Sequence, residues 1–210
     1  MTSRKFDLIS LGEPLLRLSP PRFGQLRKMS SLDVCLAGAQ YNMAANLARL
    51  GRNTALVTKL PENPLGVLVM DTCRGNGIDT RYMKLVPEAK IGITYVEFSV
   101  APRAPLSIFD RRGSAASTIS PDDFDWNEIL DNTSFAYTDG IFLGLSSSCY
   151  ETAIHFFNTA KRKRCTTCFD VNYRAHLWTP ETARQAWSPV LSNVDIVVTN
   201  RGVSELVFGF

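Results

Sequence analysis

Continuous apolar runs with strand character recur along this chain, separated by segments of helical period, and no other feature limits its possible folds as tightly. Runs that are apolar throughout are typical of strands covered on both faces. Strands that alternate with helices form βαβ units in a mainly parallel sheet. The sequence therefore predicts an α/β protein, with strands at residues 6–11, 54–60, 135–138, 166–171 and 195–199 and helices at residues 41–50, 65–76, 150–163 and 180–191.

Local signals support several of these helix boundaries. Gly51 follows the first predicted helix, and Gly75 and Gly77 lie at the end of the second. Thr179 precedes Pro180, which is the usual order of a capping residue and a proline in the first helical position. These signals favour helices that begin and end close to the predicted residues.

Residues 15–19, 93–98 and 106–110 do not fit the alternation of strands and helices. They are short extended segments with polar alternation, and a proline-containing loop joins the last two. We expect them to form a small antiparallel flap outside the main sheet, at the strand ends where α/β proteins bind ligands. No repeat or flexible linker marks a second unit, so residues 1–210 are predicted to form one domain with this flap.

Composition excludes several classes of partner. With 23 basic and 20 acidic residues the net charge is only +3, and the charges are scattered rather than gathered into a stripe that binds nucleic acid. The basic run at residues 161–164 is typical of the solvated end of a helix. No apolar stretch is long enough to span a bilayer, and Lys5 and Asp7 flank Phe6 where a signal segment would be apolar. We expect a cytoplasmic protein that binds neither nucleic acid nor membrane.

The five cysteines are odd in number and widely spaced, which is not the layout of a disulfide-stapled domain. Cys165 and Cys168 have the CxxC spacing of zinc ligands, but no second pair accompanies them. We expect reduced thiols, with this pair serving as small buried side chains, and we assign no metal ligand.

Small residues mark the first candidate binding segment, Ala37-Gly38-Ala39-Gln40-Tyr41-Asn42, between an extended run and a helix. Small side chains let a ligand approach the backbone, and amides at a helix start face oxygen-rich ligands. A single turn of small residues is more often explained by packing alone.

Two further segments place polar groups just past predicted strands. Residues 110–116 follow a flap strand and contain Arg111, and residues 170–174 follow a core strand and end at Arg174. A guanidinium group binds a carboxylate through two parallel hydrogen bonds, so two arginines in one crevice favour an acidic substrate. The alternative is that both arginines pair with surface carboxylates.

Taken in order, five segments carry a resemblance to a known family. Residues 12–20, 38–51, 59–66, 110–116 and 170–178 resemble the successive motifs of the ribokinase-like (phosphofructokinase B) carbohydrate kinases, and specifically their 2-keto-3-deoxygluconate kinase branch. The resemblance extends from Phe6 to Gly209. It implies a doubly wound, mainly parallel sheet with a small β lid, and transfer of the γ-phosphate of ATP, with Mg²⁺, to a sugar acid.

The same resemblance implies roles for individual residues and a partner. Lid closure would exclude water from the bound sugar, and the lid often forms a homodimer interface. The implied contacts are sugar hydroxyls at Gly38 and Asn42, further sugar contacts at Thr94 and Phe109, the substrate carboxylate at Arg111 and Arg174, and the nucleotide at Asn172 and Asn200.

Three substitutions depart from the pattern of the family around the sugar. Ala37 takes the place of a glycine, which stiffens the predicted hinge of the flap. Phe109 and Thr94 take places where this branch carries tyrosine. Lost hydroxyl groups change which sugars a site discriminates, so we expect altered substrate choice.

A fourth departure concerns the nucleotide. Val203 stands three residues after Asn200, where the family has a glutamate that organises Mg²⁺ and the phosphates. The Gly-Ala-Gly-Asp segment that supplies the anion-stabilising amides and the catalytic base is absent from the 210 residues, so we expect a truncated domain and assign no catalytic residue. We expect this chain alone to be an inactive kinase, with three explanations left open: a degenerate enzyme, a non-catalytic sugar-acid-binding or dimerising protein, and a fragment of an intact kinase.

Overall fold

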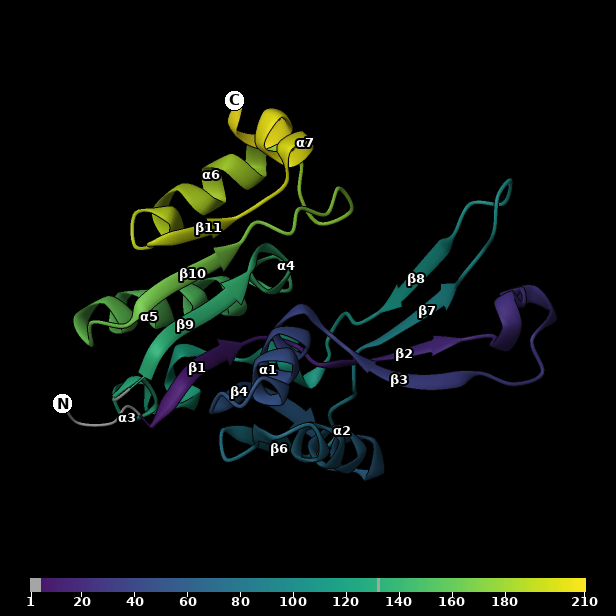
Figure 1. The fold of residues 1–210 in the computed structure, drawn as a ribbon, viewed down its shortest axis with the longest axis horizontal. Coiled ribbons are helices and arrows are strands. Elements are labelled where there is room, and N and C mark those ends of the chain that lie inside the picture. Colours follow the sequence, from purple (N-terminus) through teal and green to yellow (C-terminus); the bar gives the residue numbers. More distant parts are fainter. Residues whose placement is uncertain (1–4, 132) are drawn as a thin grey trace.

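The computed structural model describes residues 5–131 and 133–210, which form a central sheet with helices on both faces and a flap that extends from one end (Figure 1). The main sheet has the strand order β11-β10-β9-β1-β4-β5, and β6 pairs with the far end of β4. Every pairing in it is parallel. Its strands are β1 (Phe6–Leu11), β4 (Thr54–Pro61), β5 (Ile78–Asp79), β6 (Met83–Val86), β9 (Thr133–Asp139), β10 (Thr166–Asp170) and β11 (Ile196–Val198).

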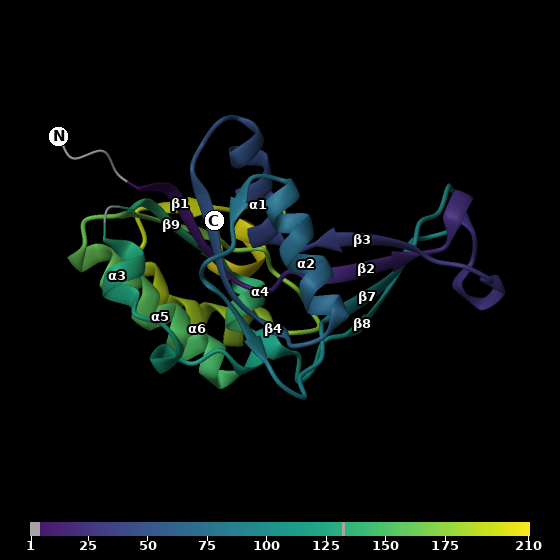
Figure 2. The same ribbon diagram turned by 90° about the horizontal axis from the view of Figure 1, so that it is seen from below.

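Strand β4 shows why both faces of this sheet must be covered. Ala55 and Val57 contribute to one hydrophobic cluster, whereas Leu56 and Leu60 contribute to another. Alternate residues of a strand point to opposite faces, so the two clusters lie on opposite sides of the sheet. Figure 2 shows α5 and α6 on one side and α1 and α2 on the other. The predicted doubly wound α/β fold is confirmed.

The helices follow the sequence signals closely. Thr179 caps α6 through a reciprocal capping box with Thr182, and Pro180 is its first residue. Asn63 caps α2 by accepting from two backbone amides. Lys161 and Arg162 lie in the last turn of α5, as the basic run predicts. The helices are α1 (Ala39–Arg49), α2 (Pro64–Gly75), α3 (Trp126–Leu130), α4 (Gly140–Leu143), α5 (Ser147–Arg162), α6 (Pro180–Leu191) and α7 (Arg201–Val203).

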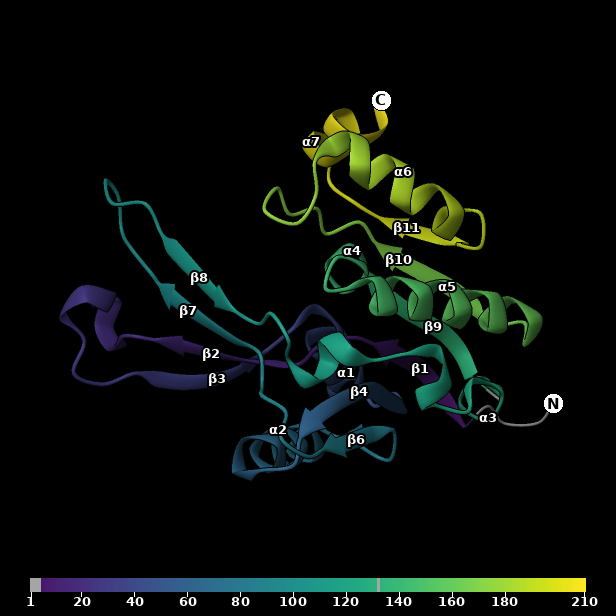
Figure 3. The same cartoon turned by 180° about the vertical axis from the view of Figure 1, so that it is seen from behind.

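The flap is a second sheet of four strands with the order β3-β2-β7-β8. Its strands are β2 (Leu15–Ser19), β3 (Asp33–Ala37), β7 (Ile93–Glu97) and β8 (Leu106–Asp110). The prediction of an antiparallel flap is wrong in one respect, because β2 and β7 run parallel. Two antiparallel hairpins meet at this parallel pairing, since the chain enters β2 and β7 from the same end of the main body (Figure 3).

The register of the flap assigns its two faces. Thr94 pairs with Arg17 on one side and Phe109 on the other, so these three side chains share a face. On the opposite face Leu16 and Ile93 pack into the cluster under α1 and α2. The base of the flap is thereby fixed to the core, while the face that carries Thr94 is turned toward the strand ends.

Strand β11 is the outer strand of the main sheet and lies within the strand predicted at 195–199. Its three residues remain exposed, with relative accessibilities of 42% for Ile196, 46% for Val197 and 43% for Val198. No helix in the described part of the chain is long and apolar enough to cross a membrane.

Candidate sugar-acid site

A cavity of about 600 Å³ opens where the carboxyl ends of β1, β9 and β10 meet the base of the flap. Ligand crevices of open α/β sheets form at this edge because polar groups of successive loops converge there. Seven of the eight predicted site residues line this cavity: Gly38, Asn42, Thr94, Phe109, Arg111, Asn172 and Arg174. The eighth, Asn200, lies elsewhere. The structure thus brings Arg111 and Arg174 to one cavity, and the roles of all eight residues remain predictions.

Gly38 forms the turn between β3 and α1 at φ +133°, a conformation that L-residues rarely adopt. A Cβ atom there would lie 2.5 Å from the carbonyl oxygen of Glu13. The carbonyl of Gly38 accepts from the amide of Asn42 at 2.8 Å and so begins α1. The small-residue turn therefore serves close packing and at the same time holds Asn42 at the cavity.

Arg111 does not pair with a surface carboxylate. Its Nε donates to Glu13 Oε2 at 2.7 Å and its Nη2 forms an ion pair with the same oxygen. The side chain of Glu13 is only 2% exposed and also accepts from the hydroxyl of Ser114. One positive charge of the cavity is therefore already balanced by a buried carboxylate. Glu13 lies in the segment 12–20, which carries part of the family resemblance. The sequence does not predict its pairing with Arg111, because the two residues are 98 positions apart.

Arg174 differs from Arg111, because it forms no ion pair with any described residue. It lies on the loop after β10, on the side of the cavity opposite the flap. Arg174 is thus the cation that remains available to an anionic ligand.

His176 lies where the charges of both Arg111 and Arg174 affect its imidazole. Its ring stacks on Phe109 of the flap, with centroids 5.0 Å apart and planes 17° from parallel. Burial lowers the pKa of His176, and the positive charges of Arg111 and Arg174 lower it further. The imidazole is therefore uncharged at neutral pH, and it joins the flap to the loop after β10. Sequence analysis did not identify this residue.

Asp139 is a second residue that sequence analysis missed, although it follows an apolar strand as Arg174 does. It is fully buried at the end of β9, where its carboxyl accepts from the amide of Phe142 at 2.8 Å and from Asn172 Nδ2 at 2.7 Å. Burial raises the pKa of Asp139 despite these hydrogen bonds, and the nearby charge of Asp170 raises it further. The floor of the cavity therefore holds a carboxyl group that resists ionisation.

Thr94 carries an unsatisfied polar atom. Its side chain is 6% exposed, and its Oγ1 has no hydrogen-bond partner among the described residues. Buried hydroxyls almost always find a partner, so the unpaired Oγ1 of Thr94 is unusual among the residues that line the cavity. Phe109, the cross-strand neighbour of Thr94, has no hydroxyl group that could hydrogen-bond to Thr94 Oγ1.

The residues predicted to contact the nucleotide do not fit a site for ATP and Mg²⁺ on their own. Asn172 donates its side-chain amide to Asp139. Asn200 is exposed, and its Oδ1 caps α7 by accepting from the amide of Val203. No described group of three or more His, Cys, Asp or Glu side chains converges as a metal site.

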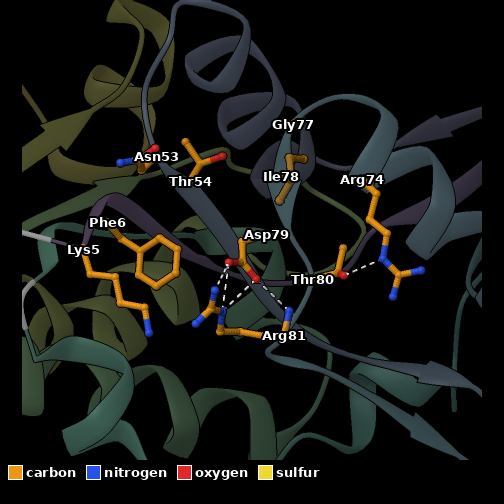
Figure 4. A pocket seen from close by; sticks show the side chains of 10 residues that line it. All are labelled: Lys5, Phe6, Asn53, Thr54, Arg74, Gly77, Ile78, Asp79, Thr80 and Arg81. Carbon is orange, nitrogen blue, oxygen red and sulfur yellow. Dashed lines mark hydrogen bonds and ion pairs between the residues drawn. The ribbon is translucent and has the colours of Figure 1, made fainter.

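A second cavity of about 600 Å³ lies at the other end of the sheet, by the first residues of β1 and β5 (Figure 4). Two of its three cations are already paired within the protein, and the third, Lys5, lies over the ring of Phe6. Arg81 pairs with Asp79, and Arg74 donates to Thr80 and pairs with Asp71. Unlike the cavity beneath the flap, this one is lined by no described residue with a buried side-chain nitrogen or oxygen that lacks a hydrogen-bond partner.

A doubly wound α/β sheet with a polar strand-end cavity under a β flap defines a class of small-molecule-binding proteins that cover their ligand with a lid. Within that class the chain belongs to the pfkB family of carbohydrate kinases, whose sequence pattern matches residues 6–208.

Individual relatives agree with this assignment. The 2-dehydro-3-deoxygalactonokinase of Haloferax volcanii is 37% identical over 192 residues, which cover 91% of this chain and 60% of that protein. The crystal structure of a 2-dehydro-3-deoxygluconokinase from Thermotoga maritima superposes with a TM-score of 0.93 at 35% identity, covering 97% of this chain and 62% of the other. The chain thus spans about three fifths of the length of these relatives.

A more distant structure shares the fold. An uncharacterized sugar kinase from Pyrococcus horikoshii, solved in complex with ATP, superposes with a TM-score of 0.81 at 23% identity, covering 90% of this chain and 62% of that one.

Proposed function

We propose that the cavity beneath the flap binds a small sugar acid of the 2-keto-3-deoxygluconate type, as the substrate-binding part of an ATP-dependent sugar kinase. The observation that carries this proposal is that Arg111 and Arg174 line one cavity, with Arg174 free of any ion pair to a described residue. An unpaired guanidinium suits a carboxylate, which it binds through two hydrogen bonds. The names of the two closer relatives, which both refer to kinases of deoxy keto sugar acids, support the same substrate class.

The two arginines have different parts in this proposal. Arg174 takes the carboxylate, whereas Arg111 is held by Glu13 and presents its remaining donors at the cavity wall. Gly38 and Asn42 face the sugar from the start of α1. The flap then covers the ligand and excludes water, which strengthens each of these contacts.

Calorimetry tests the preference for acids. We expect the chain to bind 2-keto-3-deoxygluconate more tightly than fructose, and Arg174→Ala to weaken binding of the acid by about tenfold or more, since hydrogen bonds to charged groups contribute roughly 1.5–3 kcal/mol. Arg112→Ala is the matched control, because Arg112 is exposed and does not line the cavity. Equal affinity for acidic and neutral sugars, with no effect of Arg174→Ala, would remove the case for a carboxylate site.

We further propose that residues 1–210 are the N-terminal, sugar-binding portion of a ribokinase-like domain and do not catalyse phosphoryl transfer by themselves. They contain no Gly-Ala-Gly-Asp segment, and Val203 has no side-chain oxygen to offer Mg²⁺. An ADP-release assay with ATP, Mg²⁺ and the sugar acid should give no rate above background. Turnover at ordinary kinase rates, roughly 1–100 per second, would refute this part of the proposal.

The flap supports a second proposal, that two copies of the chain associate through it. Leu106 and Ile108 of β8 are 48% and 50% exposed, and Val34 of β3 is 53% exposed. The register places Val34 and Ile108 in one cross-strand row through Leu18 and Tyr95, on the face opposite Thr94. Light scattering should show a dimer of the wild-type chain, and Ile108→Lys should convert it to a monomer. A wild-type chain that is monomeric at tens of micromolar would rule out association through the flap.

A further inference from the structure

Gln40 lies in the first turn of α1 with a relative accessibility of only 3%. Its side chain is packed so closely on Gly12, just past the end of β1, that a Cβ atom at Gly12 would lie 2.2 Å from Gln40 Cδ. The backbone carbonyl of Gln40 accepts from the hydroxyl of Ser10 at 3.4 Å. The carboxamide is therefore held in one position at the wall of the strand-end cavity, which Gln40 helps to line.

The side-chain nitrogen of Gln40 makes no close hydrogen bond in that position. Nε2 is buried and has no partner among the described residues within ordinary hydrogen-bond distance. The carboxamide contributes a looser hydrogen bond that acts to lower the pKa of Asp139, whereas the close hydrogen bonds of Asp139 come from Phe142 at 2.8 Å and Asn172 at 2.7 Å. A buried donor without an acceptor costs stability, and such groups are rare in folded proteins.

Packing alone does not account for a glutamine at this position. A methionine has nearly the same length and shape and would fill the space against Gly12 without burying an unpaired donor. Two unpaired buried groups, Gln40 Nε2 and Thr94 Oγ1, line the same cavity from α1 and from the flap. Both atoms lack the partner that an oxygen-bearing ligand in that cavity would supply.

We propose that Gln40 is a ligand-binding and specificity-determining residue, whose Nε2 donates a hydrogen bond to a carbonyl or hydroxyl oxygen of the sugar acid. The inference rests on the proposed function, because it names a further contact in the same cavity. A donor held rigidly by Gly12 selects ligands that present an acceptor at that point and rejects those that lack one, since the donor then stays unpaired.

The test compares Gln40→Met with Gln185→Met, because Gln185 is an exposed glutamine on α6. Calorimetry with 2-keto-3-deoxygluconate should show affinity about tenfold or more weaker for Gln40→Met and unchanged for Gln185→Met. Without ligand, Gln40→Met should melt about 2 °C or more higher than the wild type, because the unpaired donor is gone. A purely structural glutamine would give the opposite shift in melting temperature.

A second variant covers the case in which Gln40→Met does not fold. Gln40→Glu keeps the shape of the side chain but replaces the donor by a second oxygen, so it should also lose binding. Wild-type affinity in either folded variant overturns the inference and leaves the proposed function intact.

If the proposed function is wrong, the wild-type chain binds no sugar acid. The melting temperature then still decides the role of Gln40. A higher melting temperature for Gln40→Met would show that Gln40 Nε2 lowers the stability of the free protein and serves some other ligand. An unchanged or lowered melting temperature overturns the inference.

Discussion

Arg111 and Arg174 both line the strand-end cavity, but only Arg111 is paired with a carboxylate of the protein. Arg111 comes from the segment after β8 and is neutralised by the buried carboxylate of Glu13. Arg174 comes from the loop after β10 and keeps its charge unpaired among the described residues. Sequence position predicts that both arginines face one crevice, because both follow strands. It does not predict the pairing with Glu13, since nothing local links residues 98 positions apart.

His176 gives a titration that follows the bound anion. Both arginines lower its pKa in the free protein, so a carboxylate placed between them should cancel part of that effect and raise the pKa. An NMR titration of the imidazole signals should show the increase with 2-keto-3-deoxygluconate and none with fructose. The chain has only two histidines, so His155 provides an internal control. No difference between the two ligands would mean that the carboxylate binds elsewhere.

Asp139 should make stability depend on pH in a definite direction. Its pKa is raised in the folded state, so the folded chain holds this proton more tightly than the unfolded chain. Stability from this group is therefore present below the ordinary pKa and is lost as the pH rises through the raised value. Asp139→Asn should be more stable than the wild type near pH 7 and gain nothing near pH 3.5, as measured by urea unfolding across that range. A gain that is independent of pH would contradict this assignment.

At the scale of elements, the flap and the Gly38 turn give the cavity its shape. The buried strands and long helices follow from apolar patterns, and the sequence predicts them within a few residues. Strand β3 was anticipated only as an extended run before the small-residue segment, without bounds, because its residues at 33–35 are exposed and give little apolar signal. The parallel pairing of β2 with β7 was missed, because register between distant strands depends on how the core holds both of them.

The turn at Gly38 should not tolerate a side chain. Gly38→Ala combines an unfavourable φ of +133° with a contact of 2.5 Å to the backbone of Glu13. We expect a loss of about 2–3 kcal/mol in the free energy of unfolding, measured by urea denaturation. Gly75→Ala is the control, since a Cβ there meets nothing within 4 Å and should stabilise α2 by up to about 1 kcal/mol. Equal effects at the two glycines would show that the turn is not constrained.

At the scale of the whole molecule, the chain presents an open sheet edge. The apolar residues of β11 are exposed at the rim of the main sheet, and an exposed apolar edge strand is a template for pairing with another chain. The pattern of apolar residues predicts this strand but not its place at the edge, and the exposure of its faces depends on what packs there. This edge is therefore a second surface, besides the proposed flap interface, at which another chain could pair.

Because strand β11 is exposed, pairing at this edge should add oligomers larger than a dimer to the size-exclusion profile of the wild-type chain. Val197→Lys places a charge on β11 and should remove these species from size-exclusion profiles while changing the free energy of unfolding by no more than about 0.5 kcal/mol. Leu50→Lys, at an exposed position after α1, should leave the profile unchanged. A wild-type chain without large species at tens of micromolar would show that the edge is protected.

The central claim is that the cavity beneath the flap receives the carboxylate of a sugar acid. A crystal structure of the chain with 2-keto-3-deoxygluconate tests it most directly. We predict carboxylate oxygens at about 2.7–2.9 Å from the guanidinium of Arg174, and a further ligand oxygen within hydrogen-bonding distance of Gln40 Nε2. Clear density for the sugar acid at another place on the molecule, with Arg174 still unpaired, would contradict the account.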